Sequence, residues 1–259
     1  MRNLSPRQES ILNRVVDTHI QTAQPVSSHL ITGLFRGLYR NSYSPATIRH
    51  EMGLLEEMGY LTHPHTSAGR IPTDGGYRYY VDHSLQEERL GEGLAGNVET
   101  ELEKFAAESE DFAEQASRIL SNLTGEVSVS VQSSAPESRR PFRVCVQGSS
   151  RILEKPEFQD VEKVHLLLKA LEEKDSLAQW LAESTSESGV SVKIGRENRP
   201  KVFHACAIVS AHYTHSGRFA GTVAVFGPQR MKYARAVPIV SQMARIIARI
   251  LDTEEEANS

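Results

Sequence analysis

Three short stripes of apolar side chains near the start of the chain each have the spacing of an α-helix. The first follows Ser5-Pro6-Arg7-Gln8, which has the form of a capping box with proline in the first turn. The second begins near Ser27, and the third is made of Ile48, Met52 and Leu55. These stripes predict three helices that each turn one face toward a shared core.

The third of these helices, expected at about residues 45–58, has a defined start and a polar outer face. Ser44 can cap it through its hydroxyl, and Pro45 suits the first helical position because the amide it lacks would be unpaired there. A helix that enters the major groove of DNA needs a short, polar, cationic face. The residues that fall on the side opposite the apolar stripe are Thr47, Arg49, His50 and Gly53.

A two-stranded hairpin with a small polar tip, the wing, is predicted at residues 62–70, so the segment is typical of a winged helix-turn-helix. Gly69 would let the backbone turn and approach DNA closely, and Arg70 could reach a phosphate or a narrow minor groove. The alternative is that Arg70 pairs with Asp74 or Glu57 on the surface. The other wing residues expected to face DNA are His63, His65, Thr66 and Ser67.

The charge of the chain is unevenly distributed. The 259 residues carry a formal net charge of −4, but residues 1–83 are near neutral and rich in histidine. The first lysine is Lys104, so every cation before it is an arginine or a histidine. Because DNA responds to the local field at the reading face, the total charge does not exclude DNA binding. The absence of a strongly basic patch predicts moderate non-specific affinity.

The second half begins with a polar, glycine-containing stretch at residues 84–97, which is expected to be a linker. A 4-3-4-3 apolar pattern then runs from Val98 to Leu123 and predicts a helix with a packing seam. This seam can pack against the last helix of the same chain, against a second subunit, or against both. The residues expected in a dimer interface are Leu102, Phe105, Phe112 and Ile119.

The remaining pattern predicts an antiparallel sheet backed by the two long helices, which is an α+β arrangement. The expected domains are therefore residues 1–83, a linker at 84–97 and a second domain at 98–259. A helical segment is expected at about 157–183. The strands are expected at about residues 126–131, 142–147, 190–195, 203–213 and 218–226.

The chain offers little chemistry of the kind that enzymes use. Cys145 and Cys206 lie in apolar, strand-like runs and are expected to be inert. His63 and His65 lack a third metal ligand nearby, so no metal is predicted. No Walker motif is present and no cofactor is expected. No apolar run approaches the ~20 residues that span a bilayer, and no signal-peptide pattern is visible, so a cytoplasmic location is expected.

Several contiguous segments resemble one family of bacterial regulators. The first are TIRHEM, LEEMGYL and PHTSAGRIPTDGGYRYYVD, and those that follow in the same order are ILSNLTGEVSV, LEKPEFQDVEKVHLLLKALEEK, VKIGREN and GTVAVFGPQRMKYARAVPIVSQMARIIARIL. They resemble HrcA, the heat-inducible transcription repressors. The resemblance covers nearly the whole chain and is far more specific than a generic helix-turn-helix pattern.

The resemblance implies a winged helix-turn-helix followed by a GAF-like domain into which a dimerisation domain is inserted. Here the chain passes from Val131 through a polar stretch directly to Phe142, so the insert is reduced to about residues 132–141. His50 also departs from the family, because the T-I-R-N-E pattern would place asparagine there. The first departure puts the dimer interface in doubt, and the second puts the base preference in doubt.

By resemblance, the expected function is that of a homodimeric repressor. It would bind an inverted-repeat operator in double-stranded DNA upstream of chaperone operons and release it on heat shock, with a GroEL-type chaperonin keeping it folded. One alternative is a regulator that responds to a small molecule in a GAF-like pocket, although the sequence lacks convergent polar groups for one. Another is an interaction protein without DNA binding, against which the intact stretches from Ser44 to His50 and from Ser67 to Arg70 argue.

Overall fold

The structure is a computed structural model, and it describes residues 4–38, 43–65, 68–85, 96–98, 100, 102, 112–133, 142–184 and 189–258. The chain folds into two compact units. The first contains Met1–Gln86 together with Gln229–Lys232, and the second contains Glu87–Pro228 together with Tyr233–Ser259. Each unit has its own buried apolar core.

The first unit contains the helices α1 (Pro6–Thr22), α2 (Ser28–Leu38), α3 (Pro45–Glu57) and α4 (Asp74–His83). The predicted capping box is present at α1: the Ser5 hydroxyl accepts from the Gln8 amide at 3.3 Å, and Gln8 Oε1 accepts from the Ser5 amide at 3.0 Å. The predicted apolar stripes form the core. Its fully buried members include Ile11, Leu12, Val15, Ile31, Ile48 and Leu55.

The predicted hairpin is present between α3 and α4, with β1 (Leu61–Thr62) antiparallel to β2 (Ile71–Pro72). A third piece of extended chain, which the sequence did not reveal, joins this hairpin. Val26, in the connection between α1 and α2, exchanges two backbone hydrogen bonds with Arg70, at 2.8 and 2.9 Å. The base of the wing is therefore attached to the helical core by backbone bonds.

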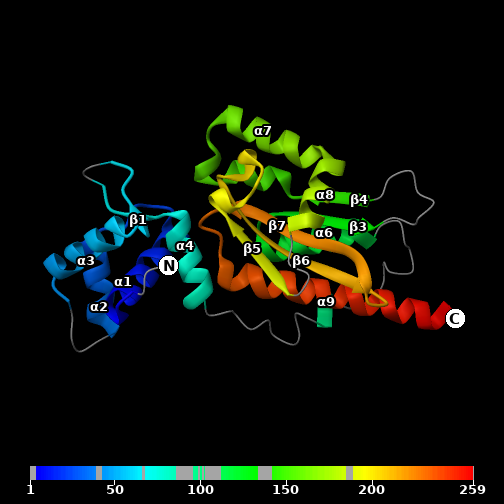
Figure 1. Cartoon of the computed structure of the whole chain (residues 1–259), viewed down its shortest axis with the longest axis horizontal. Helices are drawn as coiled ribbons and strands as arrows, with labels where there is room; N and C mark the ends of the chain where they lie inside the picture. Colours follow the sequence, from blue (N-terminus) through cyan, green and yellow to red (C-terminus); the bar gives the residue numbers. More distant parts are fainter. Residues whose placement is uncertain are drawn as a thin grey trace. The chain divides into compact units, whose positions relative to one another are not determined.

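The second unit is built on a five-stranded antiparallel sheet in the order β4-β3-β7-β6-β5 (Figure 1). The strands are β3 (Val127–Ser133), β4 (Phe142–Gln147), β5 (Val190–Ile194), β6 (Cys206–His215) and β7 (Arg218–Pro228). Strand β6 begins at Cys206, later than the expected residue 203, because Lys201–Phe203 forms a 3-10 turn that buries Phe203 in the core.

Helices cover both faces of the sheet, and the layers are visible in Figure 1. One face packs on α6 (Phe112–Thr124) and α9 (Tyr233–Asn258). The other packs on α7 (Val161–Glu172), α8 (Lys174–Ser184) and the 3-10 turns η1 (Ser149–Glu154) and η2 (Pro156–Phe158). In β3 the alternating valines face the α7 and α8 side, whereas Ser128 donates to the Ser117 carbonyl of α6.

The helical segment expected at residues 157–183 is in fact two helices. The chain turns at Glu173, whose ψ of 67° is not helical and which therefore ends α7 before α8 starts. With winged-helix and sheet-based units, the chain has the predicted α+β fold. Within the described residues, none of the helices is both long and apolar enough to cross a membrane.

Two adjacent glycines at the start of α4 give a stability test. A Cβ on Gly76 would lie 2.2 Å from the Tyr60 carbonyl oxygen, whereas one on Gly75 would have ordinary contacts at 3.5 Å. We expect Gly76→Ala to lower the free energy of unfolding by ~1–3 kcal/mol, because backbone must move to remove the clash. Gly75→Ala is the matched control and should not destabilise the protein. Urea unfolding measures both, and equal stability of the two variants would contradict the packing described.

Candidate DNA-binding surface

Helix α3 is attached to α1 through Glu51, a carboxylate that is only 8% exposed. Arg7 Nη1 lies 3.3 Å from Glu51 Oε1, and Gln8 Nε2 donates to Oε2 at 3.2 Å, so both oxygens are paired. Gln8 is also the residue that closes the capping box of α1. One side chain therefore links the start of α1 to the middle of α3, and burying the carboxylate is tolerable because it has partners.

The start of α3 is held by a second group of contacts around Tyr43. The guanidinium of Arg7 lies 5.1 Å from the centre of the Tyr43 ring, and Phe35 of α2 meets that ring edge-on at 5.5 Å. Ser44 then caps the helix as predicted, since its hydroxyl accepts from the Thr47 amide at 3.1 Å. These contacts determine where the N-terminal end of α3 points.

The end of α3 is attached to the wing by Glu56. Arg70 Nε donates to Glu56 Oε2 at 2.9 Å, and the His63 ring contacts Oε1. Burial alone would raise the pKa of Glu56, but the hydrogen bonds from His63 and Arg70 outweigh it and hold this pKa below its ordinary value. The expected alternative partners of Arg70 were Asp74 and Glu57, but the carboxylate that it binds is that of Glu56, which precedes Glu57.

The outer face of α3 carries the residues expected to read DNA. Arg49 and His50 are exposed, as is Ala46 one turn earlier, which the sequence analysis did not single out. Thr47 is only partly exposed, and its hydroxyl lies 2.9 Å from that of Ser44, so it takes part in the cap. The signal for Ala46 was its helical spacing from Arg49 and His50. An alanine methyl group can make an apolar contact with the methyl group of thymine in the major groove.

At the wing, the predicted residues divide into two kinds. Gly69 packs inward: a Cβ there would lie 2.6 Å from the Val26 carbonyl group, so close approach within the unit already explains this glycine. His63 and His65 are exposed, and Arg70 is partly exposed. Thr66 and Ser67 lie outside the described residues. The tyrosines of α4 pack the unit, with Tyr77, Tyr79 and Tyr80 at most 8% exposed.

The residues expected in a dimer interface are not available on the surface as far as the structure describes them. Leu102 is 0% exposed and Ile119 is 6% exposed within the single chain, so both side chains pack internally. Phe105 and the side chain of Phe112 lie outside the described residues. Among the described residues of the second unit, the exposed large apolar side chains are Leu153, Val161, Leu166 and Phe219.

Aliphatic and aromatic side chains pack together between the sheet and its α7–α8 layer, where a GAF-like ligand pocket would be expected. Trp180 stacks on Phe203 with ring centres 4.9 Å apart, and Phe203 meets Phe226 at 5.4 Å. A hollow of about 300 Å³ remains at the edge of this layer, bordered by Leu153, Leu168 and neighbouring side chains. This face of the sheet is a packed core.

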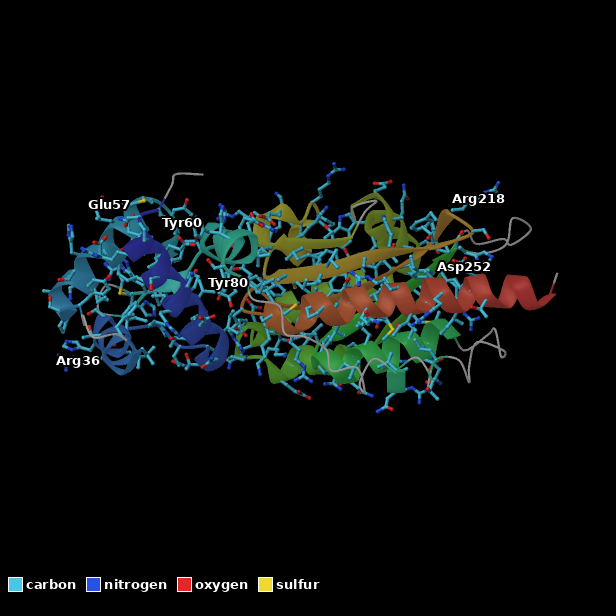
Figure 2. The ribbon with its side chains drawn as sticks, turned by 90° about the horizontal axis from the view of Figure 1, so that it is seen from below. Arg36, Glu57, Tyr60, Tyr80, Arg218 and Asp252 are labelled. Carbon is cyan, nitrogen blue, oxygen red and sulfur yellow. The ribbon has the colours of Figure 1, made fainter. Side chains whose placement is uncertain are left out.

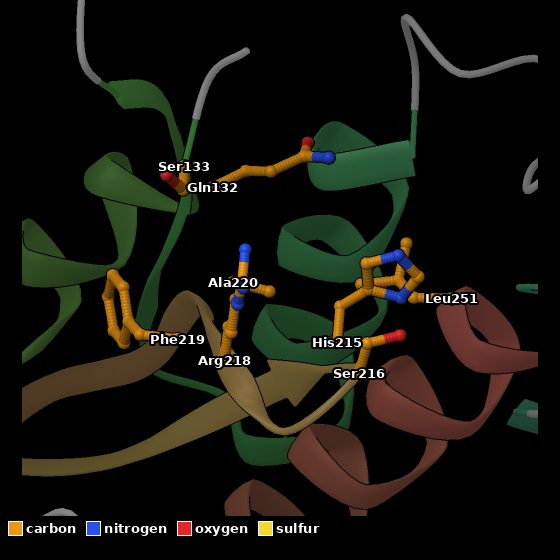
Figure 3. A pocket seen from close by; sticks show the side chains of 8 residues that line it. All are labelled: Gln132, Ser133, His215, Ser216, Arg218, Phe219, Ala220 and Leu251. Atoms are coloured by element: carbon orange, nitrogen blue, oxygen red, sulfur yellow. The ribbon is translucent and has the colours of Figure 1, made fainter. Parts of the chain in front are cut away.

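A larger hollow of about 570 Å³ lies at the hairpin between β6 and β7 (Figure 3). Gln132, Arg218 and His215 border it, and it is open to solvent. His215 also pairs with Asp252 of α9 at 3.3 Å, and Asp252 accepts from the Ser216 amide at 2.9 Å. Arg218 and Asp252 are labelled in Figure 2. The two contacts of Asp252, with His215 and with the Ser216 amide, hold the β6–β7 hairpin against α9.

Cys206 begins β6 and is buried, and His204 precedes it by two residues. Burial raises the pKa of the Cys206 thiol to about 12, which keeps it protonated and unreactive. His204 lies 3.0 Å from the Asn198 carbonyl oxygen through its Nε2. Among the described residues, no group of three or more histidine, cysteine, aspartate or glutamate side chains could hold a metal ion.

Comparison with known proteins identifies the family. Residues 95–237 match the family described as the HrcA protein C terminal domain. The chain is 30% identical to the heat-inducible transcription repressor HrcA of Shouchella clausii, over 96% of this chain and 98% of that protein. This chain belongs to the HrcA family. It is similarly 29% identical to the HrcA of Desulforamulus reducens, over 96% of this chain and 97% of that protein.

A solved structure shares the fold. The crystal structure of a hypothetical protein at 2.2 Å resolution superposes with a TM-score of 0.77 and covers 97% of this chain and 99% of that chain. Its sequence is 20% identical, so the likeness shows the fold alone.

The contacts of Glu56 predict a pH-dependent contribution to stability. Because its pKa is lowered on folding, the carboxylate stabilises the folded state above its unfolded pKa of about 4.5, and this contribution is lost as the pH falls through the folded value. Glu56→Gln should lower the free energy of unfolding by ~0.5–1.5 kcal/mol at pH 7. Glu57→Gln, at the exposed neighbouring position labelled in Figure 2, is the control and should change it little.

Denaturant unfolding at pH 7 and at steps through the unfolded pKa of about 4.5 down to about pH 3 measures this contribution. The difference between parent and Glu56→Gln should narrow as the pH is lowered, because the parent carboxylate also becomes neutral. A difference that stays constant, or an equal effect of Glu57→Gln, would contradict the role given to Glu56.

Proposed function

We propose that this chain is a heat-inducible transcriptional repressor that binds DNA sequence-specifically through its first unit. The observation that carries the proposal is the outer face of α3. Arg49 and His50 project from a helix whose position is fixed by Glu51 at its middle and Glu56 at its end. A recognition helix held in this way can present its N-terminal half to base edges in the major groove. Membership of the HrcA family supports the same function.

Different parts of the surface would have different roles. Arg49 and His50 would contact base edges or the flanking phosphates, and Ser44 would cap the helix end that faces the DNA. On the wing, His63, His65 and Arg70 would contact the phosphate backbone, together with Thr66 and Ser67, whereas Gly69 packs against Val26 at the base of the wing. Glu56 binds both His63 and Arg70, so a phosphate would have to compete with this carboxylate for them.

The proposed operator is an inverted repeat, which requires two reading heads related by a two-fold axis. We therefore propose a homodimer. One head buries only roughly 600–1,000 Å² on DNA, which is seldom enough for tight specific binding. The alignment with the Shouchella clausii relative spans 346 positions, whereas this chain has 259 residues. This difference supports the proposal that an inserted domain is reduced here to residues 132–141 and that pairing uses another surface.

We further propose that the target genes encode chaperones and that a GroEL-type chaperonin helps the repressor to stay folded. Heat would divert the chaperonin to unfolded proteins, so the amount of active repressor would fall. The support for this part is the resemblance and the printed name of the relatives, heat-inducible transcription repressor.

Arg49→Ala tests the reading face. If Arg49 makes a bidentate contact to a base, the substitution should cost ~1–3 kcal/mol in specific binding and lower the ratio of specific to non-specific affinity. Gel-shift competition measures this ratio, with a duplex that spans the chaperonin promoter of the same genome against a scrambled duplex. Lys163→Ala removes one exposed positive charge from the second unit and is the charge control. An Arg49→Ala variant with the parent ratio would mean that Arg49 does not read bases.

The oligomeric state tests the second proposal. We expect a homodimer in sedimentation experiments at micromolar concentration. Phe105→Glu and Phe112→Glu should dissociate it if the seam helix pairs the subunits, and Leu166→Glu should dissociate it if the exposed face of α7 does, since Leu166 is 50% exposed. A monomer both free and on promoter DNA would contradict the proposed mechanism, whereas a dimer that survives the phenylalanine substitutions would exclude the seam.

A further inference from the structure

Gly53 lies in the interior of α3, at a position where glycine is unfavourable. After proline, glycine is the residue that least favours a helix interior, because it loses the most backbone freedom on folding. Two internal reasons commonly explain such a glycine: a left-handed backbone, or a neighbour that leaves no room for a methyl group. Neither applies to Gly53. Its φ is not positive, and a Cβ built on it would meet nothing within 4 Å.

Other glycines of the first unit show what an internal reason looks like. A Cβ on Gly69 would lie 2.6 Å from the Val26 carbonyl group, and one on Gly76 would lie 2.2 Å from the Tyr60 carbonyl oxygen. Both positions require glycine for the unit to pack. Gly53 has no such contact, so the packing of the unit does not explain it.

The position of Gly53 points instead to a molecule outside the chain. It follows His50 by three residues and precedes Glu57 by four, so the three share one face of α3. Arg49, His50 and Glu57 are exposed. Along this face, the exposed side chains of Arg49 and His50 come first, Gly53 follows without a side chain, and the negative charge of Glu57 comes last. A bound polyanion would therefore be closest to the helix before Glu57.

We propose that Gly53 sets how closely the backbone of α3 approaches the DNA. Without a side chain at this position, the groove wall can reach van der Waals contact with the helix backbone while Arg49 and His50 extend to the base edges. A methyl group would hold the helix away from the groove and lengthen the hydrogen bonds of both residues. The proposal rests on the proposed DNA-binding function and makes Gly53 a positioning residue.

Gly53→Ala tests this idea because it should change stability and binding in opposite directions. Alanine favours the helix, so the midpoint of thermal unfolding should rise by about 2–5 °C. Affinity for a duplex that carries the chaperonin promoter of the same genome should fall by roughly tenfold, and Gly53→Leu should lower it further. Fluorescence anisotropy with the full chain measures affinity, and calorimetry measures the midpoint.

Gly33→Ala is the matched control. Gly33 lies in the interior of α2, and a Cβ there also meets nothing within 4 Å, so the same substitution should stabilise the protein without weakening binding. If Gly53→Ala binds the promoter as tightly as the parent, or if Gly33→Ala loses as much affinity, the inference about Gly53 is wrong. If the parent itself does not prefer the promoter to an unrelated duplex of equal length, the proposed function fails first.

Discussion

The orientation of α3 depends on one nearly buried carboxylate. Glu51 is 8% exposed, and each of its oxygens has a partner on α1. Removing Arg7 would take away the charged partner of Glu51, and removing Gln8 would leave one carboxylate oxygen without its donor, so each change costs more than the loss of a fully exposed ion pair. The two hydrogen bonds to Glu51 therefore fix the orientation of α3 relative to α1. Glu56 connects the end of α3 to the wing in the same way, through its contacts with His63 and Arg70.

The elements of the first unit could be predicted from sequence because their signals are local. The start of α1 is predicted by the capping box of Ser5 and Gln8, and the start of α3 by Ser44 and Pro45. Each cap joins residues three positions apart in the sequence. The contacts that hold these elements together could not be predicted. Arg7 and Glu51 are 44 positions apart, and Arg70 and Glu56 are 14 apart, so no periodicity connects them. The bridge from Val26 to Arg70 involves single residues and gives no strand pattern.

In the second unit too, the sequence pattern predicts the elements but not which surfaces they pack against. Alternation located the strands, and the apolar seam correctly indicated that Leu102 and Ile119 are buried, but it could not distinguish burial within the chain from burial between subunits. In a sheet that helices cover on both faces, small polar residues are buried as well. Ser128, for example, is buried against α6 and donates to the Ser117 carbonyl. On the α7–α8 side the stacked Trp180 and Phe203 rings occupy the interior. The α7–α8 face of the sheet is therefore a packed core.

The central claim is that the first unit recognises a two-fold symmetric DNA site. Footprinting of the full chain across the chaperonin promoter of the same genome tests it most directly. Two reading heads on half-sites about one helical turn apart, or a multiple of this distance, should protect two equivalent blocks of the duplex from cleavage. Competition with unrelated DNA should leave the protection intact. No protection, or protection removed equally by any duplex, would contradict the account.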